Sequence, residues 1–151
     1  MSEEICRISG LSDEDTISIH IAADLHDIGK IGIADHVLRR EGPLDDNDWL
    51  LMRQHPVIGY DILRKVSCFH EIALIVRHHH ECWNGSGYPD GIKGKLIPLG
   101  SRIISIADSI DAMMNDRLYR KKLSSEKCNQ EIKQNRGIMY DPNIADLVLE
   151  N

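Results

Sequence analysis

Apolar residues recur at helical spacing along most of the chain. Residues 1–9 predict a short helix that Gly10 ends. Ser12 and the acidic residues after it then predict a capped helix start, because a hydroxyl and negative charges both stabilise a helix N-terminus. In this second helix Ile17, Ile21 and Leu25 recur every four residues and are expected to form its buried face, with Gly29 ending it.

The middle of the chain predicts four further short helices. Residues 34–40 form the first, and Asp45 or Asp46 caps the second, which ends at His55-Pro56. The third covers residues 57–66, where Gly59 allows close approach and one face carries Ile58, Ile62 and Val66. The fourth covers residues 68–80, and its inward residues are expected to be Ile72, Ile75 and Val76.

The last third combines a long loop with three helices. Residues 81–99 are dense in turn-forming residues, and long ordered loops in small domains are often functional. Residues 101–116 predict a strongly periodic helix, whose apolar stripe contains Ile103, Ile106, Ala107, Ile110, Met113 and Met114. Further helices are expected at residues 124–134 and from Asp141-Pro142 to Leu149. No segment alternates as a strand would, so the prediction is an all-α bundle that forms one domain over residues 1–151.

Composition narrows the functional classes. The chain is 42% hydrophobic and 28% charged, which is typical of a globular protein, and its net charge is −6. An acidic chain is a poor candidate for binding nucleic acid through a broad positive field. No apolar run is long enough to span a membrane and no signal peptide is apparent, so a cytoplasmic protein is expected. The four cysteines are scattered and match neither a zinc motif nor a disulfide framework.

The candidate chemistry gathers around histidines and aspartates. The sequence has eight histidines, and His26-Asp27 follows an apolar run just before Gly29-Lys30. The possible ligands on or near inward faces are His26, Asp27, His55, His79, His80 and Asp108. Imidazoles with a carboxylate able to bridge suit a pair of divalent ions, which lower the pKa of a shared water and clamp phosphoryl oxygens.

Alternatives remain open for several of these residues. Asp108 can instead lie in water beside the apolar stripe, and His55 can simply interact with a helix dipole. His79 and His80 are about 100° apart on a helix, so both can face one site only near a helix end. Lys30, Arg117 and Arg120 can neutralise a phosphodiester, although Arg120 and the lysines after it can also be a solvated cluster.

The motifs together resemble the HD-GYP domain, a subgroup of the HD superfamily of metal-dependent phosphohydrolases. The resemblance runs from about residue 10 to the C-terminus. The segments that carry it are His26-Asp27-Ile28-Gly29-Lys30, Gln54-His55-Pro56-x-x-Gly59, His79-His80-Glu81-x-Trp83-Asn84-Gly85-Ser86-Gly87-Tyr88-Pro89 and Ala107-Asp108-x-x-Asp111-Ala112. The resemblance implies a helical bundle and hydrolysis of cyclic di-GMP to pGpG or GMP.

The same resemblance implies roles for individual residues. It makes His26, Asp27, His55, His79, His80 and Asp108 the ligands of two or three divalent ions, with iron or manganese favoured over zinc, nickel or magnesium. Asp27 would bridge two ions, and Asp27 and Lys30 would be the catalytic pair. Substrate contacts would come from Lys30, Gly87, Tyr88, Pro89, Asp111, Arg117 and Arg120. An upstream sensor or receiver domain, GGDEF-type partners and a homodimer are also implied for family members.

Departures from the family pattern leave a second hypothesis. Family members usually carry an additional helix before the His-Asp pair with a further histidine ligand, and this bundle is expected to lack it. His20 is about 120° around the helix from His26 and is not expected to replace that ligand. The alternatives to an active phosphodiesterase are therefore a catalytically impaired regulatory module and, less favoured, an HD-type enzyme acting on another nucleotide.

Overall fold

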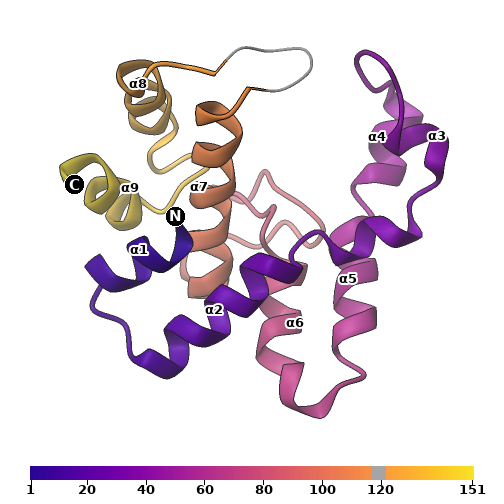
Figure 1. The fold of residues 1–151 in the computed structure, drawn as a ribbon, viewed down its shortest axis with the longest axis horizontal. Helices are drawn as coiled ribbons and strands as arrows, with labels where there is room; N and C mark the ends of the chain where they lie inside the picture. The colour runs from indigo at the N-terminus through magenta and orange to yellow at the C-terminus, as the bar shows by residue number, and fades with distance from the viewer. Residues whose placement is uncertain (117–121) are drawn as a thin grey trace.

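The computed structural model describes residues 1–116 and 122–151, and these residues are helical with connecting loops. Helix α7 (Leu99–Met114) runs through the middle of the molecule in Figure 1. On one side of it lie α1 (Ser2–Ile8), α8 (Ser125–Asn135) and α9 (Pro142–Glu150). Helices α2 (Asp13–Leu25) and α6 (His70–Arg77) also pack against α7. The predicted all-α bundle is confirmed for the described residues, which contain no strand.

The remaining elements extend away from α7. The 3-10 helix η1 (Ile28–Gly32) follows α2 and packs on α5 (His55–Leu63). Between them, α3 (Asp35–Leu38) and α4 (Asp46–Met52) form an arm beyond α5 (Figure 1). Two short 3-10 helices complete the set, η2 (Ser67–Phe69) before α6 and η3 (Gly94–Leu96) inside the long loop.

The expected caps are present and explain where several helices begin. Ser12 accepts a hydrogen bond from the backbone N–H of Asp15 at 3.1 Å, and Asp45 accepts one from Asp48 at 3.0 Å. Ser124 caps α8, and Asp141 caps α9. The buried side chain of Asp141 also pairs with Arg102 on α7 at 2.6 Å, which fixes α9 to the central helix.

The buried face of α2 differs from the prediction. Ile17 is 58% exposed, whereas Ile19 and Ala22 are buried, and Ile21 and Leu25 only flank the core. Helix α2 also ends at Leu25 rather than at Gly29, so that His26 is its C-cap residue. Gly29 instead lies inside η1. The helix carries a second apolar stripe, which contains Ile19 and Ala22. Packing against α6 and α7 buries this stripe rather than the predicted one.

Other inward residues divide in the same way. On α6, Ile72, Ile75 and Val76 are buried as predicted, although the helix begins at His70 and ends at Arg77. On α5 the buried residues are His55, Pro56, Gly59 and Leu63. Of the predicted face, Ile58 is half-buried and Ile62 is exposed, whereas Val66 is exposed and lies beyond the end of the helix. The stripe of α7 is confirmed except for Met114, which is exposed.

The core is formed mainly by isoleucines from α1, α2, α6, α7, α8 and α9. All four cysteines are unpaired, as expected. Among the described residues, no helix has both the length and the apolar character needed to cross a lipid bilayer.

Candidate metal centre

The His-Asp pair lies where α2 gives way to η1. His26 is the C-cap of α2, and its Nδ1 lies 2.6 Å from the backbone carbonyl of Ala23. Asp27 follows as the N-cap residue of η1, and its Oδ2 accepts a hydrogen bond from Lys30 Nζ at 2.6 Å. The tight turn of η1 therefore places Lys30 back over the carboxylate that precedes it.

His55 is held opposite this pair at the start of α5. Its Nδ1 lies 2.7 Å from the carbonyl of Met52, and its side chain is buried. A Cβ atom on Gly29 would overlap the backbone carbonyl of His55, so only glycine allows η1 to lie this close to α5. This close approach brings Asp27 Oδ1 to within 3.5 Å of His55 Nε2.

His79 and His80 follow directly after the end of α6. Because α6 ends at Arg77, the two residues lie in a turn, and their rings are 4.0 Å apart between centroids. His79 is buried, and its Nδ1 lies 2.6 Å from the carbonyl of Val76. The two side chains can share a site because they lie just beyond the end of α6, which is the condition expected from their separation of about 100° on a helix.

The ring nitrogens opposite these carbonyls converge. A carbonyl oxygen only accepts hydrogen bonds, so Nδ1 of His26, His55 and His79 carries the proton and each Nε2 keeps a lone pair. Nε2 of His55 lies 3.4 Å from Nε2 of His79. One ligand atom from each of His55, His79 and His80 lies within 4.8 Å of the others. The donor set fits a divalent transition metal ion, because imidazole lone pairs held by second hydrogen bonds are its usual ligands.

Burial keeps these imidazoles neutral and available as ligands. It lowers the pKa of His55, and it lowers the pKa of His79 to about 3 against an ordinary value near 6.5. Burial and the neighbouring His79 lower the pKa of His80 to about 2. Metal binding at neutral pH therefore requires no deprotonation of these rings.

Asp27 lies between two of the histidines. Its Oδ2 is 3.6 Å from His26 Nε2, and its Oδ1 is 3.5 Å from His55 Nε2. Burial works against its ionisation, but the hydrogen bond from Lys30 lowers its pKa overall. An ionised carboxylate with one oxygen toward each histidine has the arrangement that a bridging ligand needs.

Asp108 and Asp111 on α7 lie near the histidine cluster. Asp108 is half-buried and lines a cavity of about 320 Å³ with His79, His80 and Tyr88. It also lines a second cavity, with His26 and Asp111. Asp111 is exposed and accepts a hydrogen bond from Asn115. Arg117 and Arg120, the other proposed substrate contacts, lie outside the described residues.

The loop containing Gly87, Tyr88 and Pro89 covers His80. The Tyr88 ring stacks on the His80 ring with centroids 4.9 Å apart, and the Tyr88 backbone N–H bonds the His80 carbonyl. A Cβ atom on Gly87 would overlap the backbone of residues 80–82, so this loop requires glycine there. The peptide bond before Pro89 is cis. Burial raises the pKa of Tyr88 to about 12, so its phenol keeps its proton and can donate a hydrogen bond.

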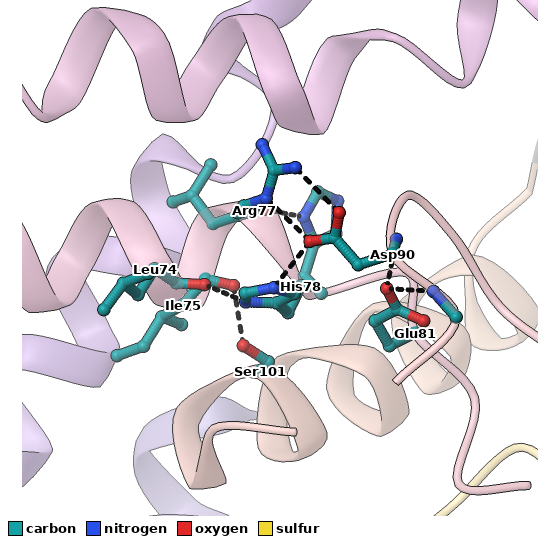
Figure 2. A network of polar contacts seen from close by, with 10 residues as sticks. Leu74, Ile75, Arg77, His78, Glu81, Asp90 and Ser101 are labelled. Atoms are coloured by element: carbon teal, nitrogen blue, oxygen red, sulfur yellow. Dashed lines mark hydrogen bonds and ion pairs between the residues drawn. The ribbon is translucent and has the colours of Figure 1, made fainter. Parts of the chain in front are cut away.

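A polar network fastens this loop to α6 (Figure 2). Arg77 binds Asp90 with two hydrogen bonds of 2.7 and 2.8 Å, and His78 Nε2 lies 3.0 Å from the same carboxylate. Glu81 is buried and accepts hydrogen bonds from the backbone N–H groups of Asp90 and Gly91. His78 therefore supports the loop rather than the histidine cluster.

Sequence reasoning missed two residues of this region. Glu81 belongs to a quoted motif, but its role as an anchor for the loop depends on the fold of residues 81–91. Arg53 has no part in any quoted motif, yet it lines the cavity that His79, His80 and Asp108 share. Its position just before Gln54-His55 was the available signal.

Comparison with known proteins places this chain in a family. The family model described as HD domain matches residues 1–144. The cyclic di-GMP phosphodiesterase response regulator RpfG of Xanthomonas campestris is 41% identical, with 93% of this chain covered and 38% of RpfG. A cyclic di-GMP phosphodiesterase of Thermotoga maritima is 39% identical over 99% of this chain and 41% of its own length. This chain thus spans about two fifths of these curated relatives.

The fold also resembles that of solved structures. A cyclic GMP-AMP specific phosphodiesterase of Vibrio cholerae superposes with a TM-score of 0.77 at 23% identity. The match covers 99% of this chain and 41% of the other. The predicted HD-GYP resemblance and the helical fold are confirmed, and the chain belongs to the HD domain family.

Proposed function

We propose that this chain is a metal-dependent phosphodiesterase domain that hydrolyses cyclic di-GMP to pGpG or GMP. The observation that carries the proposal is the convergence of the Nε2 atoms of His55 and His79 at 3.4 Å, beside His80 and Asp27. The names of the relatives in Xanthomonas and Thermotoga support the substrate.

The proposal includes two or three divalent ions. Iron or manganese suits the mixed imidazole and carboxylate ligands. His55, His79, His80 and Asp27 would hold one side of the centre, and His26 and Asp108 the other. When bound, the ions would acidify a water molecule and polarise the phosphoryl oxygens.

The chain's own residues would bind and orient the substrate. Lys30 is half-exposed beside Asp27 and would neutralise charge on the scissile phosphate. Tyr88, held by its stack on His80, would donate a hydrogen bond from its phenol to a substrate oxygen. Asp27 would stay ionised, because the hydrogen bond from Lys30 keeps its pKa low.

Several broader expectations belong to the same proposal. One is that residues 1–151 form a single domain. Another is that the whole protein joins this domain to a sensor or receiver domain. GGDEF-type partners and a homodimer complete the set. Size-exclusion chromatography with light scattering would test the homodimer.

The function is tested by metal analysis combined with turnover. The chain is purified, its iron, manganese and zinc contents are measured, and cyclic di-GMP and 3′3′-cGAMP are each supplied as substrate. We expect cyclic di-GMP to be consumed, activity to disappear with a chelator and to return with manganese. Bound metal without turnover of either dinucleotide would instead support the impaired regulatory module.

A further inference from the structure

Arg53 lies close to two aromatic side chains at the edge of the candidate metal centre. Its guanidinium carbon is 5.3 Å from the centre of the Tyr88 ring and 6.0 Å from that of Trp49. Trp49 is on α4, and Arg53 follows it by one helical turn, so the contact with Trp49 is local. The contact with Tyr88 is long-range and joins α4 to the loop that covers His80.

Arg53 also differs from the other arginines in its charge environment. Each other arginine that the structure describes, from Arg7 in α1 to Arg136 after α8, forms an ion pair with an aspartate or a glutamate. Within residues 1–116 and 122–151, Arg53 has no such carboxylate partner. Its positive charge is therefore available to an anion from outside the chain.

Two hollows meet at Arg53. The first, of about 320 Å³, is the cavity above His79, His80 and Asp108. The second, of about 300 Å³, is lined by Arg53 with Trp49, Leu50 and Asp46. Trp49 is 45% exposed and so offers an open aromatic surface there. Each hollow is at the small end of the range for ligand pockets, so one nucleotide suits each better than a whole dinucleotide does.

The chemistry of the guanidinium fits a phosphate at this junction. When its flat faces pack against aromatic rings, the N–H groups remain available at its edge, where they match phosphate oxygens. An exposed tryptophan beside it can stack a nucleobase, an interaction worth about 1–3 kcal/mol per base. Asp46 lines the same hollow, which favours a hydrogen-bonding base edge rather than a second phosphate in that place.

We propose that Arg53 and Trp49 bind the half of the cyclic dinucleotide that is not being cleaved. Arg53 bonds the second phosphate, and Trp49 stacks the base attached to that half. This inference rests on the proposed function and extends it from the scissile phosphate to the rest of the substrate. Both residues are substrate-binding groups that take no part in the reaction at the metal centre.

The test separates binding from chemistry. Initial rates with cyclic di-GMP are measured for Arg53→Gln, Trp49→Ala and Arg39→Gln. Arg39 is the matched control, because it is an exposed arginine whose only described carboxylate partner is Asp35 on its own helix. We expect KM to rise tenfold or more for the first two variants, with kcat falling less than threefold. Arg39→Gln should match the wild type, and Trp49→Phe should recover most of the loss in Trp49→Ala.

Direct binding provides a second readout. Calorimetric titration of cyclic di-GMP is carried out in a slowly reacting Lys30→Ala background, with and without Arg53→Gln. We expect the dissociation constant to rise tenfold or more with Arg53→Gln, and by a similar factor for 3′3′-cGAMP if the contact is to phosphate. A loss confined to cyclic di-GMP would overturn the phosphate assignment, because it would show that Arg53 reads a guanine base.

Failure of this inference differs from failure of the proposed function. A wild-type protein that turns over cyclic di-GMP with the same KM as Arg53→Gln and Trp49→Ala would overturn the inference and leave the function intact. A wild-type protein that neither binds nor hydrolyses cyclic dinucleotides would overturn both. Melting temperatures of all variants should agree within a few degrees, since both side chains lie at the surface.

Discussion

Nε2 of His55 and Nε2 of His79 face each other at 3.4 Å, and both nitrogens are acceptors because their Nδ1 atoms bind backbone carbonyls. Two lone pairs directed at one another are unfavourable in a buried site unless a cation or a proton lies between them. The low pKa of His79 shows that a proton is disfavoured there. The backbone contacts alone therefore hold these two nitrogens in an arrangement that could accept a metal ion.

Replacing His79 should remove the metal. His79→Gln takes away a buried imidazole ligand, and we expect metal affinity to fall on the order of 100-fold, at least as much as the loss of an outer-shell partner costs. Metal content by plasma emission spectrometry checks this. His20→Gln is the control, because His20 is exposed and its only ion-pair partner among the described residues is Asp24 at 3.8 Å. Equal metal content in the two variants would contradict the assignment.

Substitutions at Asp27 and Lys30 should affect metal binding and catalysis differently. We expect Asp27→Ala to lose metal, since its two oxygens face different histidines. Lys30→Ala should retain metal while kcat falls on the order of 10²–10³-fold, as when a preorganised charge at the transition state is lost. If Lys30→Ala lost its metal, the hydrogen bond to Asp27 at 2.6 Å would be its main contribution instead.

The metal-free protein should lose stability as pH falls below 6.5. His79 and His80 have pKa values lowered to about 3 and about 2, while the unfolded chain titrates near 6.5. The unfolded state then binds more protons, so the free energy of unfolding is retained above pH 6.5 and falls below it. The limiting slope is about 1.4 kcal/mol per pH unit for each histidine.

Urea unfolding with chelator present, at pH values between 7 and 4.5, measures this slope. His79→Gln removes one of these buried histidines and should make the slope shallower by about 1.4 kcal/mol per pH unit. A His20→Gln variant should keep the wild-type slope. An unchanged slope in His79→Gln would mean that His79 takes up its proton in the folded state as readily as in the unfolded chain.

The loop over the metal centre should depend on Asp90. Its bidentate pair with Arg77 is partly buried, and the hydrogen bond from Arg77 lowers the pKa of Asp90. In a double-mutant cycle of Arg77→Ala and Asp90→Ala we expect a coupling free energy of about 1 kcal/mol. Both variants should also reduce turnover, because Tyr88 is carried by the same loop.

The exposed pair of Arg136 and Asp146 provides the matched cycle. It is also bidentate, with both contacts at 2.6 Å, but its side chains are more exposed, and it joins α9 to the end of α8 rather than the loop to α6. Its coupling should be smaller, and its variants should leave turnover unchanged. Similar effects of the two cycles on turnover would contradict a specific role for Asp90.

The sequence predicted the helices well where local chemistry defines them. Ser12 and Asp45 cap helices as expected, because a cap is formed within a few residues, and Ser124 and Asp141 cap the two helices predicted to begin there. The buried faces of α2 and α5 were predicted less accurately. Ile17 and Ile62 satisfy helical spacing but are exposed, since the neighbouring helices that choose the face are far away in sequence.

The candidate site divides in the same manner. Histidine spacing and the HD-GYP resemblance identified His55, His79 and His80, which the fold brings together. The position of Arg53 close to Trp49 and Tyr88 could not be predicted, because it joins α4 to a loop more than thirty residues later. The Arg77–Asp90 pair likewise depends on the path of that loop.

Gly29 should be essential for the close approach of η1 to α5. In Gly29→Ala the new methyl group would overlap the carbonyl of His55 and the backbone nitrogen of Gly59, and backbone atoms cannot move aside as a flexible side chain can. We expect a loss of about 3 kcal/mol in the free energy of unfolding, at the upper end for overpacking. Gly32→Ala is the control, because its methyl group would meet only the side chain of Ile58, with the nearest atoms at 3.0 Å. That side chain can rotate away, so the control should lose much less stability.

Where Gly29→Ala still folds, Asp27 should be displaced from His55 and metal affinity should fall with it. Equal stability and metal affinity in the two variants would show that η1 does not need this contact to present Asp27.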